Sequence, residues 1–113
     1  MITIYHNNKC QKSREGLAYL KSLSNEIEVN EYMNSELTEQ KIKELLKKLN
    51  YKPIELVRTN EKIWKENFKN SNLSEEEIIQ KMIAFPQLIQ RPLIVYQNKA
   101  IVARPTEKIK DLF

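Results

Sequence analysis

The sequence predicts an α/β domain in which a β-α-β unit opens the chain, helices fill its middle and a β-β-α unit closes it. Two observations indicate this class. Short runs rich in β-branched and aromatic residues stand near both ends, whereas the stretch between them has the apolar spacing of amphipathic helices. A length of 113 residues suffices for one hydrophobic core, so we expect a single domain over residues 1–113.

The first unit is predicted to be β-α-β. Residues 2–5 (ITIY) form a strand, and the polar residues 6–9 end it. The helix that follows places Leu17 and Leu20 on one face, and residues 27–30 alternate apolar and polar like a second strand. Because parallel crossovers are right-handed, the two strands should lie side by side with this helix on one face of the sheet.

Three helical pieces are predicted between the two units. Thr38 is the N-cap of the first piece and Asn50 ends it, after which Pro53 opens a short segment. Ser74 begins the last piece with a capping box, and Pro86 ends that helix. These caps mark the limits of helices that cover most of the middle of the chain.

The closing third is predicted to contain a hairpin and a last helix. Residues 93–96 and 100–103 are apolar strands on either side of a polar turn at residues 97–99. Thr106 then caps a helix over residues 107–113. This completes the β-β-α unit.

The order of these elements is that of a thioredoxin-like domain with a helical insertion. We expect a four-stranded mixed sheet, with the insertion at about residues 38–90. The sequence has no internal repeat, linker or low-complexity segment that would contradict this architecture.

Cys10 is the only cysteine of the chain and stands at the predicted strand-to-helix turn. The unpaired N–H groups and partial positive charge of a helix N-terminus favour a thiolate over a thiol, and Lys9, Lys12 and Arg14 act in the same direction. Such surroundings lower the pKa of a cysteine and make it a nucleophile at neutral pH. The alternative is an inert, buried cysteine that packs as a small hydrophobe. The polar and basic neighbours favour the reactive interpretation.

Composition excludes several classes of function. With one glycine, the chain has no glycine-rich loop to cradle the phosphates of a nucleotide. With one cysteine and one histidine, it has no typical zinc ligand set and no internal disulfide, so we expect no bound metal or cofactor. The absence of a signal peptide and of a long apolar run predicts a cytoplasmic protein that does not bind membranes.

The net charge of +4 comes from lysines interspersed with glutamates. The lysines of residues 41–48 lie mostly on the polar side of a predicted helix, which is typical of a solvated face rather than of a nucleic-acid-binding stripe. We therefore predict no nucleic-acid partner, and a small anionic substrate fits the mild positive charge.

The segment HNNKCQKSREGL resembles the glutaredoxin-coupled arsenate reductase family, in which an Asn-Pro-x-Cys-x-x-Ser-Arg turn leads from a strand into the first helix. Asn8 stands where that pattern has proline. Three further segments resemble the other signatures of the family, in the same order and at similar spacing: LVRTN, LIQRPLIVY and VARPTE. The resemblance thus covers nearly the whole chain.

The resemblance implies that Cys10 attacks arsenic and that Arg58, Arg91 and Arg104 surround the oxyanion. Physical chemistry agrees, because a tetrahedral oxyanion needs several permanently charged, forked donors. Taken singly, each arginine could instead be a surface charge or an ordinary salt-bridge partner.

Three further residues receive roles from the resemblance. Pro92 aligns with the proline that this fold holds in cis beside the catalytic turn, and His6 aligns with a histidine that helps to tune the thiol. The alternative for His6 is a solvated loop residue. Ser13 occupies the position where a dithiol enzyme of this fold keeps its second cysteine, and its hydroxyl could donate a hydrogen bond to the Cys10 thiolate.

The function implied is reduction of arsenate to arsenite, with glutathione as co-substrate and a glutaredoxin as partner. One alternative is a monothiol oxidoreductase that forms mixed disulfides with glutathione and proteins. Another is a transcription regulator of the Spx type, which binds RNA polymerase. Those regulators usually carry a C-x-x-C switch, whose second thiol Ser13 replaces here.

Overall fold

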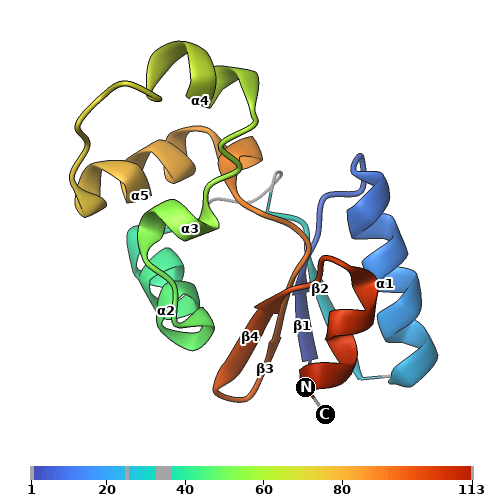
Figure 1. Ribbon diagram of the computed structural model, residues 1–113. Coiled ribbons are helices and arrows are strands. Elements are labelled where there is room, and N and C mark those ends of the chain that lie inside the picture. Colours follow the sequence, from blue (N-terminus) through green and yellow to red (C-terminus); the bar gives the residue numbers. More distant parts are fainter. Residues whose placement is uncertain (1, 25, 33–36, 113) are drawn as a thin grey trace. The chain divides into compact units, whose positions relative to one another are not determined.

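The computed structural model describes residues 2–24, 26–32 and 37–112 (Figure 1). The chain divides into two compact units, one made of residues 1–35 and 91–113 and the other of residues 36–90. The elements of the first unit are β1 (Ile2–Tyr5), α1 (Gln11–Leu23), β2 (Ile27–Asn30), β3 (Leu93–Tyr96), β4 (Lys99–Val102) and the 3₁₀ helix η2 (Thr106–Leu112). The elements of the second are α2 (Glu39–Leu49), α3 (Pro53–Leu56), α4 (Lys62–Asn67), α5 (Glu75–Ala84) and the 3₁₀ helix η1 (Pro86–Leu88).

The sheet of the first unit is four-stranded and mixed, in the order β2-β1-β3-β4. Strand β1 pairs in parallel with β2, placing Ile4 opposite Val29. It pairs in antiparallel with β3, where Ile4 faces Ile94, and β3 pairs in antiparallel with β4. The predicted α/β class, the mixed sheet and the adjacency of the first two strands are therefore confirmed.

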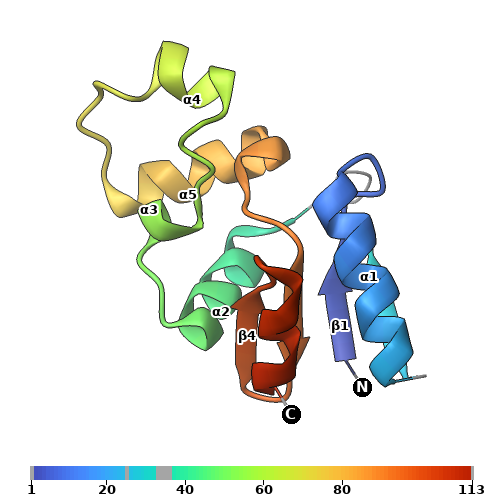
Figure 2. The same ribbon diagram turned by 45° about the vertical axis from the view of Figure 1, so that its right-hand side comes forward.

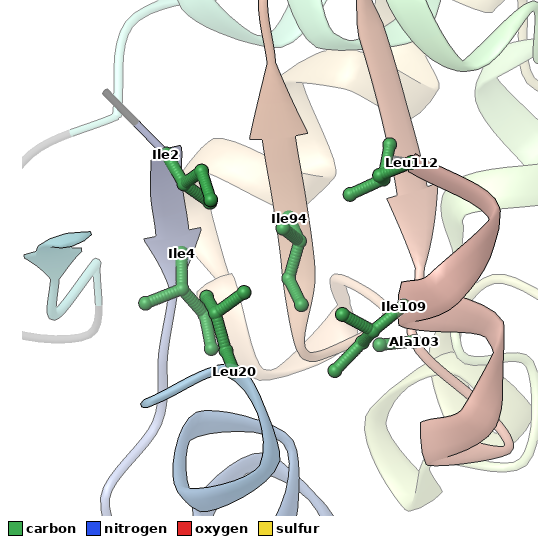
Figure 3. Packing of buried hydrophobic residues seen from close by; sticks show 7 residues of the cluster. All are labelled: Ile2, Ile4, Leu20, Ile94, Ala103, Ile109 and Leu112. Carbon is green, nitrogen blue, oxygen red and sulfur yellow. The ribbon is translucent and has the colours of Figure 1, made fainter. Parts of the chain in front are cut away.

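One face of this sheet carries the core of the first unit. Because side chains alternate along a strand, Ile2 and Ile4 share a face with Ile94 of the neighbouring strand. Helix α1 runs alongside β1 (Figure 2), and α1 and η2 both cover this face. Figure 3 shows the buried cluster, which consists of Ile2, Ile4, Leu20, Ile94, Ala103, Ile109 and Leu112. Each large aliphatic side chain buried in this way contributes roughly 1.5–3 kcal/mol.

Gly16, the only glycine of the chain, lies where α1 touches Pro92. A Cβ at this position would stand 2.7 Å from the Pro92 Cγ, which is closer than real contacts allow. Glycine therefore permits the first half of α1 to pack directly on the residue that follows Arg91. This contact brings the start of the helix close to the start of β3.

The helical unit confirms the predicted caps. The Thr38 hydroxyl accepts a hydrogen bond from the Lys41 N–H, and Asn50 ends α2 in the left-handed region with a φ of 59°. Ser74 and Glu77 form a reciprocal capping box at the start of α5. Lys43 on α2 lies 3.0 Å from a carboxylate oxygen of Glu76, which joins these two helices at their surface.

The end of the chain differs from the prediction in two details. The register pairs Tyr96 with Lys99, so β4 covers residues 99–102 and the turn has two residues, of which Gln97 has a φ of 56°. The last helix is 3₁₀ rather than α, because its first turn closes by the tighter bond from the Lys108 N–H to the Pro105 carbonyl. Ile109 and Leu112 are buried as its apolar contacts, and residue 113 lies outside the described residues.

Candidate active site

Cys10 is the N-cap of α1, with an extended backbone that turns the chain from β1 into the helix. Its N–H donates to the Asn7 carbonyl at 3.0 Å, and its own carbonyl accepts from the Arg14 N–H at 3.0 Å. The Asn7 side chain also accepts from the Lys9 N–H. These bonds fix the turn, and the predicted location of Cys10 between a strand and a helix is confirmed. Its sulfur interacts with the backbone N–H groups of Lys12 and Ser13 in the first helical turn.

Ser13 is fully buried beneath this turn. Its hydroxyl accepts a hydrogen bond from the Asn7 N–H at 2.9 Å and lies 2.8 Å from His6 Nδ1. The group of Ser13 that faces the Cys10 sulfur is its backbone N–H. The Ser13 hydroxyl thus ties the turn to the end of β1, whereas its amide acts on the thiol.

His6 is buried, with 4% of its surface exposed. The backbone N–H of His6 donates to the Asn30 carbonyl at 2.8 Å, which extends the parallel pairing of β1 and β2 by one residue. Burial lowers the pKa of His6, although the Glu31 charge and the hydrogen bond with Ser13 oppose that effect. The alternative of a solvated loop histidine is therefore wrong, and burial favours the neutral form of the imidazole beneath the cysteine turn.

Arg91 and Arg104 meet at Cys10. Arg104 Nη2 lies 3.6 Å from the Cys10 sulfur, and Arg104 Nε donates to the Arg91 carbonyl at 2.6 Å. The Arg91 side chain, which is only 9% exposed, hydrogen-bonds to the same sulfur. The peptide bonds Arg91–Pro92 and Arg104–Pro105 are both cis. Two guanidinium groups and one sulfur therefore share one site within the first unit.

The surroundings of Arg91 stabilise its positive charge. Burial would lower the pKa of Arg91, but its hydrogen bond with Cys10 and its electrostatic and hydrogen-bonding interaction with Tyr32 raise it above the usual value. Tyr32 is itself fully buried. Arg91 is therefore a permanent cation whose head group is held from two sides.

The pKa of the Cys10 thiol results from opposing influences. Burial raises it, but the hydrogen bond from Arg91, the Ser13 N–H, the Arg91 charge and the Lys12 N–H together lower it below the ordinary value of a thiol. Lys12 acts through its backbone amide, while the Arg14 guanidinium donates to the Asn8 carbonyl at 2.9 Å. The sequence predicts this lowering of the pKa from the helix N-terminus and from basic neighbours; the helix amides contribute as predicted, whereas the charged side chain that contributes is Arg91.

Arg58 belongs to the helical unit. Its N–H donates to the Leu88 carbonyl at 2.6 Å, and its guanidinium lies 3.1 Å from a Glu61 carboxylate oxygen. The backbone bridge between Val57 and Ile89 holds this segment in place. The place of Arg58 in the oxyanion pocket stays a prediction.

Sequence reasoning missed Asn7 and Gly16. Asn7 belongs to a polar cluster that signalled only the end of a strand, although its carbonyl, amide and side chain all hold the turn. Gly16 did carry a signal, because a single glycine in the middle of a helix implies a close approach. Within the described residues, no group of three His, Cys, Asp or Glu side chains is arranged to hold a metal ion, and no helix is long and apolar enough to cross a bilayer.

A cysteine at the start of the first helix, beside a cis-proline and two arginines at one end of a four-stranded mixed sheet, is the arrangement of a thioredoxin-like protein. The chain belongs to the ArsC family, whose sequence profile matches residues 5–112.

Two relatives and one solved structure match over almost the whole length of both chains. The chain is 40% identical to the uncharacterized protein YfgD of Escherichia coli, covering 98% of this chain and 95% of that protein. It is 29% identical to a Haemophilus influenzae arsenate reductase, covering 98% and 97%. A solved structure described as a putative arsenate reductase from Yersinia pestis superposes with a TM-score of 0.93 at 36% identity, covering 98% of this chain and 99% of that one.

Proposed function

We propose that the protein reduces arsenate to arsenite with Cys10 as the nucleophile. The observation that carries this proposal is the convergence of Arg91 and Arg104 on the Cys10 sulfur. Two guanidinium groups beside a thiolate form a site for a tetrahedral oxyanion that also presents the attacking atom. The relatives named as arsenate reductases support arsenate as that oxyanion.

In the first step, the Cys10 thiolate attacks arsenic and one arsenate oxygen leaves as water, taking up the proton that the thiol lost. An arsenic–sulfur bond replaces an arsenic–oxygen bond, and arsenic stays in its +5 state. The permanent charges of Arg91 and Arg104 stabilise the oxygens of the adduct as charge shifts onto them. Arg58 is a third candidate for this role.

Reduction itself takes two electrons, and this chain owns one sulfur. Glutathione supplies a second thiol, which forms a second arsenic–sulfur bond as another arsenic oxygen leaves as water. A glutaredoxin thiolate then attacks the glutathione sulfur to form a mixed disulfide, and the electron pair of the broken arsenic–sulfur bond reduces arsenic to its +3 state. Water hydrolyses the remaining Cys10–arsenic bond, which releases arsenite and returns Cys10 as a thiol. A cycle that depends on reduced thiols fits the cytoplasm.

The test is an arsenate reductase assay with glutathione and glutaredoxin, each omitted in turn. Turnover should require both thiols and should vanish in Cys10→Ser, whose hydroxyl is a far weaker nucleophile. Arg14→Met is the matched control, because its guanidinium binds the Asn8 carbonyl of the same turn. Sustained turnover without added thiol, or with Cys10→Ser, contradicts the mechanism. Glutathione mixed disulfides formed without any arsenate reduction would favour the monothiol oxidoreductase instead.

A further inference from the structure

A pocket of about 200 Å³ in the first unit shares Arg104 with the site around the Cys10 sulfur. Residues from the first turns of α1, from the segment after β4 and from the start of η2 line it: Lys12, Glu15, Ala103, Arg104, Pro105, Thr106 and Glu107. Arg104 belongs both to this pocket and to the site around the sulfur, because its Nη2 lies 3.6 Å from Cys10. The pocket and the sulfur are thus connected through the side chain of one arginine.

The rim of this pocket carries charges of both signs. Lys12 and Arg104 are cationic, whereas Glu15 and Glu107 are anionic. The Lys12 ammonium and a Glu15 carboxylate oxygen are 3.5 Å apart on the surface of α1. A site for a simple oxyanion has no use for two carboxylates. Paired cations and carboxylates instead suit a zwitterion, whose carboxylate and ammonium each find an opposite charge.

The size of the pocket limits what it can hold. Small-molecule sites usually enclose about 300–1,000 Å³, so a pocket of about 200 Å³ takes one end of a peptide-sized ligand. An α-amino acid group, with one carboxylate and one ammonium on one carbon, fits both the size and the mixed charge.

We propose that this pocket binds the γ-glutamyl end of glutathione and presents the glutathione thiol to the adduct on Cys10. The inference rests on the function proposed above, which requires an external thiol. The γ-glutamyl end carries the α-carboxylate and the α-ammonium of glutathione together. Arg104 and Lys12 bind the carboxylate, and Glu15 and Glu107 bind the ammonium. Arg104 would then contact both co-substrates, which places them next to each other.

The experiment measures the reaction of glutathione with a disulfide on Cys10 in the absence of arsenate. Cys10, as the only cysteine, is converted to its methylthio mixed disulfide. Glutathione is then added at increasing concentration, and loss of the adduct is followed by intact mass spectrometry. Attack by the glutathione thiolate breaks the sulfur–sulfur bond and forms a new disulfide, with methanethiol or the Cys10 thiolate as the leaving group. A binding pocket predicts that the rate saturates with glutathione concentration.

The specificity of the pocket is tested with a change on each side. Glu15→Gln/Glu107→Gln should raise the half-saturating glutathione concentration roughly fivefold, the effect of losing an exposed ion pair of up to about 1 kcal/mol. N-Acetylglutathione, which lacks the ammonium, should bind the wild-type pocket about as weakly as glutathione binds the double variant. Its half-saturating concentration should be the same in wild type and in the double variant. The matched control, Glu28→Gln/Asp111→Asn, removes two exposed carboxylates outside the pocket and should change nothing.

The outcomes separate this inference from the proposed function. Saturation that depends on the ammonium and on the two glutamates supports the pocket, even if arsenate is not reduced. Rates that rise linearly with glutathione and are equal in wild type and double variant overturn the pocket, even if arsenate is reduced. Saturation unchanged by the double variant and by N-acetylation overturns the assignment of the γ-glutamyl end.

Discussion

Replacing Arg91 with methionine should reduce the reactivity of Cys10 at neutral pH. The substitution removes a hydrogen bond and a positive charge from the thiolate, while methionine keeps much of the buried volume. A hydrogen bond to a charged group is worth about 1.5–3 kcal/mol, and each 1.4 kcal/mol is a factor of ten. Because Cys10 is only partly buried, solvent weakens the interaction and we take the lower end of that range. At a pH below the titration midpoint, the fraction of Cys10 present as thiolate should therefore be about tenfold smaller in Arg91→Met than in wild type.

The assay is the rate of iodoacetamide alkylation of Cys10 as a function of pH. In wild type the midpoint should lie below that of a free thiol, and in Arg91→Met it should move upward while the plateau rate at high pH stays the same. Arg14→Met, a neighbour that binds the Asn8 carbonyl rather than the sulfur, should leave the midpoint in place. If Arg91→Met and Arg14→Met titrate alike, Arg91 does not stabilise the thiolate and the reasoning fails.

Three further perturbations test the surroundings of the cysteine. Gly16→Ala should destabilise the protein by about 1–3 kcal/mol in urea unfolding, despite the better helix propensity of alanine, because its Cβ would meet Pro92 at 2.7 Å. Ser13→Ala should cost about 1–3 kcal/mol, since the buried Asn7 N–H loses its acceptor. The pKa of His6 is lower in the folded protein than in the unfolded chain, so on acidification the unfolded chain binds a proton first. The free energy of unfolding should therefore fall as the pH drops below 6.5 in wild type, and this fall should be absent in His6→Gln.

Each of these has a control and a contradicting result. Ala18→Gly, on the exposed side of α1, should cost only the propensity term of about 1 kcal/mol. A Gly16→Ala protein more stable than wild type would show that Pro92 moves aside freely. If Ser13→Ala has the same urea midpoint of unfolding as wild type, the hydroxyl does not stabilise the turn. Identical pH profiles of wild type and His6→Gln would contradict the burial of a neutral imidazole.

The fold could be predicted from sequence to the extent that its signals are local. Thr38, Asn50 and Ser74 cap their helices through contacts within four residues, so the motif and the structure coincide. The hairpin turn has two residues rather than the predicted three, because its length depends on the register, which pairs Tyr96 with Lys99. The 3₁₀ form of the last helix depends on how Pro105 begins it, and amphipathic spacing does not encode that choice.

The proximity of three predicted site residues agrees with the sequence analysis, whereas their functional roles stay predictions. The family resemblance named Cys10, Arg91 and Arg104, which the fold brings together from opposite ends of the chain. Sequence alone could not show that the Ser13 hydroxyl serves the turn or that Gly16 seats the helix on Pro92, because both contacts depend on tertiary packing. The same dependence explains why basic neighbours in sequence contribute less to the thiolate than Arg91, which is distant in sequence.

The most direct measurement of the central claim is protection of Cys10 from alkylation by arsenate, and by sulfate, which cannot be reduced in this way. If Cys10, Arg91 and Arg104 form one oxyanion site, both anions should slow alkylation along a saturating curve. Arg91→Met and Arg104→Met should each shift that curve to at least tenfold higher anion concentration, whereas Arg14→Met should leave it unchanged. Protection that is absent in wild type, or that persists unchanged in both arginine variants, would show that the two guanidinium groups do not bind an anion at the sulfur.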